Sequence, residues 1–327
     1  NGYEKKKLKH QFHLSLSPSP SLLEQSVKPI SSSTPHSTNH PQLFQYLPFC
    51  PYLIFSMLIL PRHRLFPFLL LLFLFQGSEP SATFKIVNKC RRTIWPGLLS
   101  GSGTAQLSTT GFALSPGESR TVPIPTAWSG RVWARTLCSF NSSTQRFACR
   151  TGDCGSGVVE CKGSGAEPPT TLAEFTLNGA GGLDFYDVSL VDGYNLPVLV
   201  IPRKIQAGLC GATGCLVDLN GACPKDLRVG GLACRSACEA FGNPEYCCSG
   251  AYATPDTCPP NPYSLFFKYA CPRSYSYAYD DKTSTYTCPG ASYVIMFCPP
   301  PYSSLKLLGS RKDGAALPLV NKTRMYV

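Results

Sequence analysis

The main acid–base groups available beyond residue 81 are carboxylates, because all five histidines lie before that point, at His10, His13, His36, His40 and His63. Without histidine, a Ser-His-Asp or Cys-His catalytic site, an HExxH zinc site and an imidazole proton shuttle are all excluded there. No P-loop or dinucleotide-binding fingerprint occurs either. Clustered carboxylates focus a negative potential, and a paired acid and carboxylate is the minimum that cleavage of a glycosidic bond requires.

The second chemically distinctive residue type is cysteine, with 17 among 327 residues. This number indicates an oxidising compartment and a fold held by disulfides. A zinc site made of thiolates is disfavoured, because no C-x-x-C pair occurs. We expect no metal and no cofactor.

The first 81 residues are predicted to be absent from the mature protein. Residues 1–56 are rich in Ser, Pro, His and Gln and predict either upstream read-through of the transcript or a disordered extension. From Met57 the pattern is that of a secretory signal over residues 57–81, with a basic segment followed by the apolar run Leu65–Phe75. That run is too short for a bilayer, which needs roughly 20 apolar residues. We expect cleavage near Ser81.

Removal of the leader changes the cysteine count and the net charge of the chain. Cys50 is lost, which leaves 16 cysteines and an even number for pairing. The remaining 23 basic and 16 acidic residues give a formal charge of +7. They lack the clustered basic and aromatic pattern of nucleic-acid binders, so no nucleic acid is expected as a partner.

The elements that must position the carboxylates are mostly strands. Alternation of polar and apolar residues predicts strands in 83–87, 131–136, 170–201 and 292–297. A helix is predicted over Ala233–Phe241, with Cys234 and Cys238 on one face. We expect a mainly β fold, a sandwich or barrel interrupted by disulfide-rich insertions.

The segment Cys149-Arg150-Thr151-Gly152-Asp153-Cys154, followed by Gly157 and Cys161, resembles the signature of the thaumatin family of plant pathogenesis-related proteins. The resemblance covers residues 82–299, and all 16 cysteines fall in the family's order. Further segments that carry it are 82–90, 130–136, 168–175, 183–195 and 276–299.

This resemblance implies a flattened β-sandwich with disulfide-rich lobes that contain loops and short helices. The thaumatin-like domain spans 82–298, with a sandwich body (82–137, 168–209 and 272–298), a small disulfide lobe (138–167), a disulfide-rich lobe (210–271) and a flexible tail (299–327). The implied disulfides are Cys90–Cys298, Cys138–Cys149, Cys154–Cys161, Cys210–Cys288, Cys215–Cys271, Cys223–Cys234, Cys238–Cys247 and Cys248–Cys258.

The resemblance also implies a cleft lined by one basic and four acidic residues, which are Arg131, Glu174, Asp187, Asp192 and Asp280. Arg135 is a second candidate for the basic role, and Arg273 is expected to bring a cation near Asp280. Asp187 and Asp192 are five residues apart, an odd offset, so they share a cleft only if the chain bends at Asp192-Gly193. Aromatic residues that could stack on sugars are Tyr186, Tyr194, Tyr263, Phe266 and Phe267.

The function that the family resemblance implies is that of a secreted antifungal defence protein. It would bind cell-wall β-1,3-glucan, or another fungal wall polysaccharide, through the acidic cleft and act on fungal walls or on the membrane surface. One alternative is a weak endo-β-1,3-glucanase with Glu174 as general acid and Asp192 as nucleophile or base. Another is a secreted inhibitor or signalling protein outside defence. We expect a monomer.

Two sequons and the tail bear on the location of the protein. Asn141-Ser142-Ser143 and Asn321-Lys322-Thr323 are candidate glycosylation sites at Asn141 and Asn321. The expected location is the extracellular space, with the vacuole as the alternative if the tail directs sorting.

Overall fold

The computed structural model describes residues 82–203 and 210–300. The leader predicted over 1–56 and 57–81 and the tail from residue 301, which includes Asn321, lie outside the described residues. Within the described part, no helix combines the length and the apolar character needed to cross a membrane.

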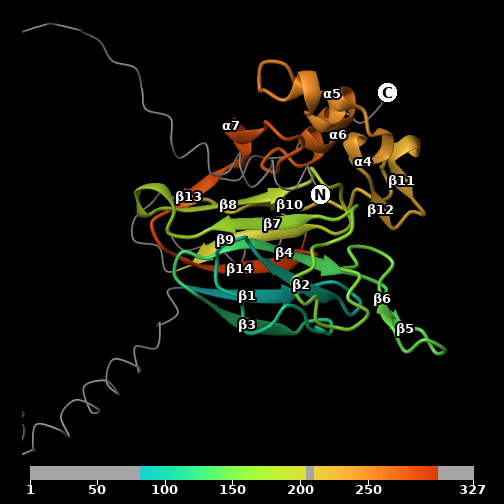
Figure 1. Ribbon diagram of the computed structural model, residues 1–327, viewed down its shortest axis with the longest axis vertical. Helices are drawn as coiled ribbons and strands as arrows, with labels where there is room; N and C mark the ends of the chain where they lie inside the picture. The colour runs from blue at the N-terminus through green and yellow to red at the C-terminus, as the bar shows by residue number, and fades with distance from the viewer. Residues whose placement is uncertain (1–81, 204–209, 301–327) are drawn as a thin grey trace, which may run out of the picture. The chain divides into compact units, whose positions relative to one another are not determined.

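Two five-stranded sheets form the body (Figure 1). In the first, here the β1 sheet, β1 lies between the parallel strand β14 and the antiparallel strand β3. Phe84 and Ile86 point into the protein and Lys85 points out, as the alternation in the sequence predicts. Its strands, in spatial order, are β10 (Thr213–Cys215), β9 (Val198–Arg203), β14 (Ser292–Phe297), β1 (Ala82–Asn88) and β3 (Ser119–Ile124).

The second sheet, here the β7 sheet, is antiparallel throughout. Its central strands are buried on both faces, because one face covers the sandwich core and the other carries the lobes. Its strands, in spatial order, are β13 (Tyr286–Cys288), β8 (Asp184–Ser189), β7 (Leu172–Thr176), β4 (Ser129–Arg135) and β2 (Trp95–Ser100).

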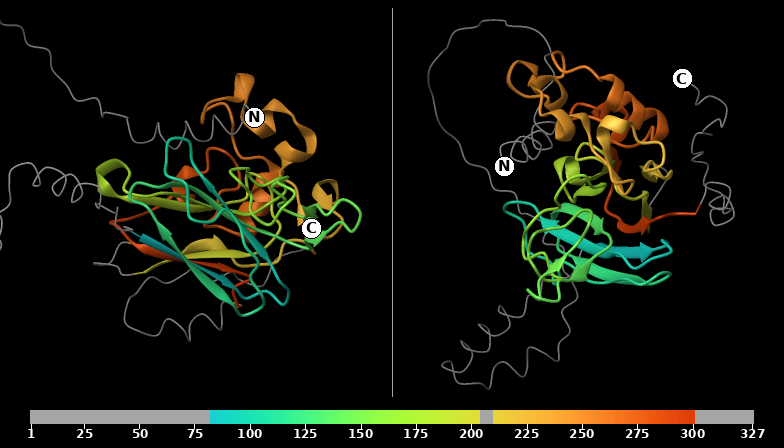
Figure 2. Two further views of the ribbon diagram at one scale, coloured as in Figure 1. Left: turned by 60° about the horizontal axis from the view of Figure 1, so that its bottom comes forward. Right: turned by 90° about the vertical axis from the view of Figure 1, so that its right-hand side faces the viewer.

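The main core lies between the two sheets, which form two layers (Figure 2). Phe84 of the β1 sheet contacts Phe175 of the β7 sheet at a ring-centroid distance of 4.4 Å, and Tyr293 contacts Phe175 at 5.2 Å. Trp128 adds an edge contact to Phe84 at 5.5 Å. Interdigitated aromatic rings of this kind contribute more than their buried area alone. The predicted β-sandwich is confirmed.

Two lobes extend from the body. The small lobe holds the hairpin β5 (Ser139–Phe140) and β6 (Phe147–Ala148). The disulfide-rich lobe gathers short elements beside the β7 sheet, at the top of Figure 1. They are η2 (Lys225–Leu227), β11 (Arg228–Val229), β12 (Ala233–Cys234), α4 (Ala237–Phe241), α5 (Pro244–Cys247), η3 (Gly250–Tyr252) and α6 (Pro262–Ala270); η1 (Ala180–Gly182) and α7 (Asp281–Ser284) belong to the connections of the body.

Eight disulfides staple these parts, and they are the eight pairs that the family resemblance implies. The two with the greatest sequence separation, 208 and 78 residues, join the ends of the body and the lobe to β13. The pairs are Cys90–Cys298, Cys138–Cys149, Cys154–Cys161, Cys210–Cys288, Cys215–Cys271, Cys223–Cys234, Cys238–Cys247 and Cys248–Cys258.

The helix predicted over Ala233–Phe241 is wrong in its first half. Ala233 and Cys234 form β12, which pairs with β11, and the backbone of Cys234 also exchanges two 2.8 Å hydrogen bonds with Tyr194. Ser236 then caps α4 by accepting a hydrogen bond from the Glu239 amide at 3.2 Å. Cys234 and Cys238 therefore do not share a helical face.

Candidate functional site

Three of the expected site residues form one row across the β7 sheet. Arg131 of β4 is the cross-strand partner of Glu174 of β7, and Glu174 is the cross-strand partner of Asp187 of β8. Their sequence neighbours Val132, Ala173 and Val188 point into the sandwich core, so the three charged side chains point to the opposite face. We call Arg131, Glu174 and Asp187 the carboxylate row.

Burial makes this row chemically unusual. Glu174 is 7% exposed and Asp187 is 3% exposed, while Arg131 is half-buried. Directly opposed side chains in an antiparallel pair have Cβ atoms roughly 4.5–5.5 Å apart, so two carboxylates lie next to one another with a guanidinium beside them. The two carboxylates repel one another, and the guanidinium of Arg131 beside Glu174 offsets part of that repulsion.

Asp192 lies on a turn that follows β8 at once. The strand ends at Ser189, and the Gly193 amide donates to the Leu190 carbonyl at 3.0 Å, so the chain bends where the Asp-Gly pair predicts it. The Asp192 carbonyl accepts from the Thr170 amide at 2.8 Å, which ties the turn to the start of β7. Because of this bend, the odd offset between Asp187 and Asp192 does not force their side chains onto opposite faces of the sheet.

A fourth carboxylate, Glu239 of α4 in the disulfide-rich lobe, interacts electrostatically with Asp192. Partial burial raises the pKa of the Glu239 carboxyl, the negative charge of Asp192 raises it further, and Arg235 lowers it. Glu239 is not among the site residues predicted from the sequence. The signal that could have found it is the pattern Ser236-Ala237-Cys238-Glu239, a helix-capping sequence that puts an acidic residue in the first turn.

Asp280 is held by contacts within the protein. One of its oxygens, Oδ2, lies 2.8 Å from Lys268 Nζ and accepts from the Ser276 amide and hydroxyl, each at 3.0 Å. The other, Oδ1, accepts from the Thr283 hydroxyl at 3.1 Å. These contacts indicate an anchoring role for Asp280. Lys268 is its cationic partner, whereas Arg273 donates to the Tyr286 hydroxyl at 2.6 Å, so the expectation that Arg273 supplies the nearby cation is not met.

The segment that Asp280 anchors runs beside the carboxylate row. The Tyr275 amide donates to the Val188 carbonyl at 2.9 Å, and its carbonyl accepts from the Leu190 amide at 2.8 Å, so Tyr275 lies against β8. Burial raises the pKa of the Tyr275 hydroxyl, and the charge of Asp187 raises it further. Tyr275 is thus a neighbour of the row that no sequence motif singles out.

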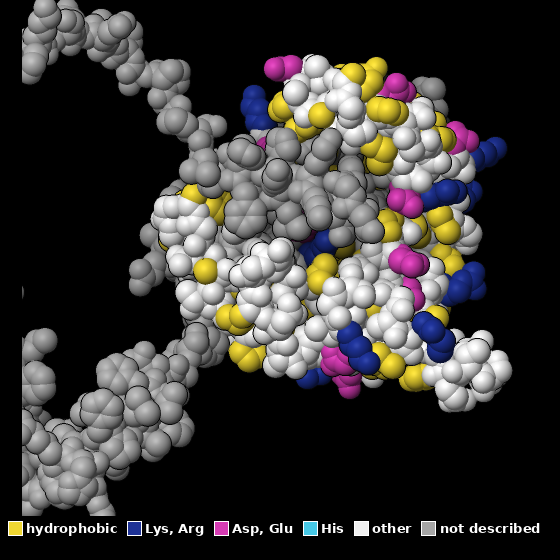
Figure 3. Space-filling model, in the orientation of Figure 1, with side chains coloured by type: hydrophobic (Ala, Val, Ile, Leu, Met, Phe, Trp, Pro, Cys, Tyr) yellow, Lys and Arg dark blue, Asp and Glu magenta, His cyan; other side chains and the backbone are white. Residues whose placement is uncertain are grey.

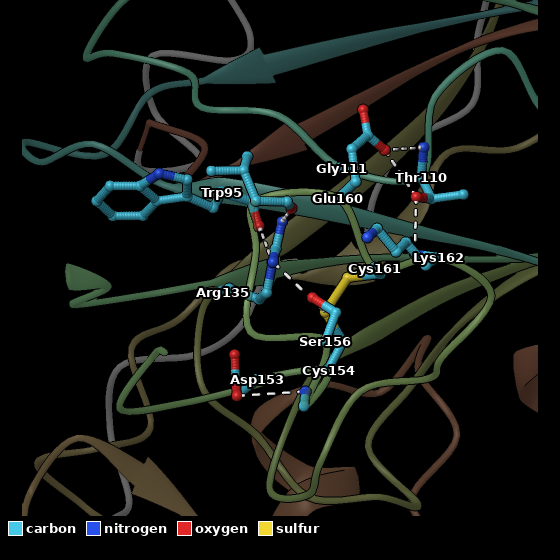
Figure 4. Close-up of a disulfide and its surroundings, with 12 residues drawn as sticks. Trp95, Thr110, Gly111, Arg135, Asp153, Cys154, Ser156, Glu160, Cys161 and Lys162 are labelled. Carbon is cyan, nitrogen blue, oxygen red and sulfur yellow. Dashed lines mark hydrogen bonds between the residues drawn. A yellow bond between two sulfur atoms is a disulfide. The ribbon is translucent and has the colours of Figure 1, made fainter. Parts of the chain in front are cut away.

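Arg135, the second basic candidate, is excluded from the site by burial. Its guanidinium donates to the carbonyls of Trp95 at 3.0 Å and Val159 at 2.6 Å, close to the Cys154–Cys161 disulfide (Figure 4). Burial lowers the pKa of Arg135 to about 10, and the charges of Asp153 and Glu160 oppose that shift. Arg135 therefore fastens the small lobe to β2.

Most of the aromatic residues expected to stack on sugars belong to the cores instead. Tyr186, Tyr194 and Phe267 are at most 1% exposed, and the Tyr186 hydroxyl donates to the Gly211 carbonyl at 2.7 Å. Only Tyr263 and Phe266 of that set are partly exposed. The positions of these aromatic residues in the sequence did not indicate which of them are buried and which are partly exposed.

Two further observations concern modification and metals. Asn141 lies on the exposed tip of the β5–β6 hairpin, where its side-chain oxygen accepts from the Ser143 and Thr144 amides, each at 2.9 Å. Over residues 82–203 and 210–300, the His, Cys, Asp and Glu side chains form no group of three or more that could hold a metal ion.

Comparison with known proteins identifies the family. The model described as "Thaumatin family" matches residues 88–299. The chain belongs to the thaumatin family. Among similar members, Thaumatin-like protein 1 of Arabidopsis thaliana is 58% identical over 253 residues, which covers 74% of this chain and 97% of that protein.

Two further members of the thaumatin family agree with this assignment. Pathogenesis-related protein 5 of Arabidopsis thaliana is 52% identical over 236 residues, covering 71% of this chain and 96% of its own. Thaumatin-like protein 1 of Pyrus pyrifolia is 52% identical over 225 residues, covering 67% and 91%. The resemblance inferred from the cysteine pattern is thereby confirmed.

Proposed function

We propose that this thaumatin-family protein is a secreted antifungal defence protein that binds a cell-wall β-1,3-glucan through the carboxylate row and Asp192. The observation that carries the proposal is the alignment of Arg131, Glu174 and Asp187 on three adjacent strands, with both carboxylates nearly buried. Carboxylates accept strong hydrogen bonds from sugar hydroxyls, and the guanidinium donates to sugar oxygens. Hydrogen bonds donated by sugar hydroxyls would weaken the repulsion between the two carboxylates.

Secretion is part of the same proposal. Eight disulfides in a domain of this size persist only in an oxidising compartment. The exposed sequon at Asn141 is proposed to be glycosylated there, and cleavage near Ser81 to release the mature chain. Localisation of the full chain with and without residues 299–327 distinguishes the extracellular space from the vacuole.

A pulldown against a panel of wall polysaccharides tests binding. We expect the wild type to sediment with insoluble β-1,3-glucan and Glu174→Gln to lose most of that binding, because the amide keeps the shape but not the charge. Glu118→Gln is the matched control, since Glu118 precedes β3 in the other sheet. Equal binding by all three proteins, or none by the wild type, would contradict the proposal.

The second candidate is a weak endo-β-1,3-glucanase with Glu174 as general acid and Asp192 as nucleophile or base. It is supported by the direct opposition of two nearly buried carboxylates, Glu174 and Asp187, next to the turn that carries Asp192. Release of reducing sugar by the wild type and not by Glu174→Ala would favour the enzyme. Binding without release would favour the binding protein, and loss of every polysaccharide interaction would leave the inhibitor or signalling role.

A further inference from the structure

Three aromatic rings form a compact cluster on the surface of the disulfide-rich lobe. Phe241 of α4, Tyr246 of α5 and Tyr263 of α6 have centroid separations of 5.7, 5.3 and 6.0 Å. Phe241 is 39% exposed and the two tyrosines are partly exposed. Figure 3 shows hydrophobic side chains gathered over this lobe. We call these three residues the ring cluster.

The ring cluster is held rigid by covalent bonds and helix caps. Cys238–Cys247 joins α4 to α5, and Cys248–Cys258 joins the end of α5 to the segment that leads into α6. Asn261 caps α6 by accepting from the Tyr263 and Ser264 amides, each at 3.0 Å. Such short helices would not form alone, so these ties place the rings before any ligand arrives and reduce the entropy lost on binding.

The chemistry around the rings suits a sugar. The Tyr263 hydroxyl donates to Asp226 Oδ2 at 3.3 Å, which puts an exposed carboxylate at the edge of the rings. A pyranose presents an apolar C–H face that packs on a ring and hydroxyls that donate to a carboxylate. A folded protein partner needs about 800 Å² on each side, whereas an entire aromatic side chain buries roughly 150–250 Å², so three partly exposed rings are too small for one.

The helix α4 begins beside the turn that carries Asp192 and ends at the ring cluster. The backbone of Tyr194, at the end of that turn, exchanges two 2.8 Å hydrogen bonds with Cys234, and α4 begins three residues later. Glu239 of α4 interacts electrostatically with Asp192, and Phe241 lies roughly 200° further around the helix. A helix with its side chains is about 10–12 Å across. A ligand that contacts both the carboxylate row and the rings must therefore pass over α4, which only a long chain can do.

We propose that the ring cluster is a second contact surface for the polysaccharide that occupies the carboxylate row, reached only by long chains that cross α4. This inference rests on the proposed function. It predicts that the affinity of the protein for the polysaccharide increases with the length of the polysaccharide chain, and that contacts with the ring cluster cause this increase.

The test is calorimetric titration of the full mature chain with β-1,3-gluco-oligosaccharides of increasing length. We expect Phe241→Ala and Phe241→Leu, which keeps an apolar side chain without the ring, to lower affinity for long chains about 3- to 10-fold and to leave affinity for short chains unchanged. Tyr269→Ala is the control, because Tyr269 of α6 is 76% exposed and outside the cluster. Near-ultraviolet circular dichroism checks that each variant is folded.

The outcomes separate the two proposals. If the wild type binds longer chains more tightly and both Phe241 variants do the same, the ring cluster is not a contact surface, while the proposed function stands. An affinity of the wild type that does not depend on chain length also overturns the ring cluster as a contact surface. If the wild type binds no length of chain, the proposed function fails and this inference fails with it.

Discussion

The ion pair between Lys268 and Asp280 shows how single residues hold in place a segment that lies beside the carboxylate row. Lys268 Nζ also donates to the Ser274 carbonyl at 3.2 Å and the Ser284 hydroxyl at 2.9 Å, so one ammonium joins α6 to both ends of the segment that contains Asp280. The side chains of Lys268 and Asp280 are only 21% and 10% exposed. Removal of the cation leaves a carboxylate with little access to water.

Lys268→Met is therefore expected to destabilise the fold by on the order of 1–3 kcal/mol, between the values for exposed and buried pairs. Urea unfolding with the disulfides intact measures the change. Lys282→Met, at an exposed lysine of α7, is expected to have no comparable effect. Equal midpoints for the two variants would show that the pair does not stabilise the protein.

Site residues could be predicted from the sequence where the family pattern specifies residue types in strands, as at Arg131, Glu174 and Asp187. Glu239 and Tyr275 could not, because their nearness to Asp192 and Asp187 arises from tertiary contacts between distant segments. Arg135 illustrates the converse. It has the same parity as Arg131 in β4 and points to the same face, but the small lobe covers that end of the strand.

Among the elements, the turn that carries Asp192 is tightly constrained. Gly193 has a φ of +81°, and a Cβ at this position would lie 2.6 Å from Pro169 Cβ and 2.7 Å from the Cys234 carbonyl oxygen. The β8–β9 turn is therefore locked between the start of β7 and the disulfide-rich lobe. Any larger residue must move one of these neighbours.

Gly193→Ala is expected to destabilise the protein by about 2–4 kcal/mol, through the left-handed backbone and the two contacts together. Gly117→Ala is the matched control, since Gly117 has a φ of +83° but open space around its Cβ position, and should cost about 1–2 kcal/mol. Thermal unfolding compares the two, and glucan binding should weaken for Gly193→Ala alone. Equal losses for both variants would mean that the close approach does not matter.

Strands were the most predictable elements. The sequence pattern located β1, β4 and β14 to within a few residues, because each buries one or both faces against a core. The stretch predicted over 170–201 did not separate β7, β8 and β9. The lobe was less predictable. Cys234 and Cys238 have the spacing of neighbours on a helix. The backbone hydrogen bonds between Cys234 and Tyr194 and the helix cap at Ser236 nevertheless place the start of α4 after Cys234. A segment this short has only a weak helical preference of its own.

For the molecule as a whole, buried tyrosines govern the response to alkali. Burial raises the pKa of the hydroxyls of Tyr186, Tyr194, Tyr275 and Tyr293. In the unfolded chain these groups ionise near ~10. The stability they contribute is therefore complete below that pH and is lost as the pH rises above it, by up to about 1.4 kcal/mol per pH unit for each hydroxyl.

Arg135 acts in the opposite direction, because its lowered pKa of about 10 favours the folded state as the pH rises further. The four tyrosine hydroxyls outnumber this single guanidinium, so the net effect of alkali is a loss of stability. Urea unfolding above pH ~10, followed with tyrosinate absorbance, is expected to show a steep loss of stability. Tyr293→Phe should make the loss shallower. A flat profile, or an identical slope for the variant, would contradict this account.

The parallel pairing of β1 with β14 sets the order of events when the chain is made. Phe84 is paired with Tyr293, and the disulfide next to this ladder spans 208 residues. At roughly 5–20 residues per second, that stretch takes about 10–40 s to synthesise. Throughout this time β1 can pair with β3 while its other edge waits for a strand that does not yet exist. Closure of the sandwich therefore waits until β14 has been synthesised, and its high contact order makes it slow.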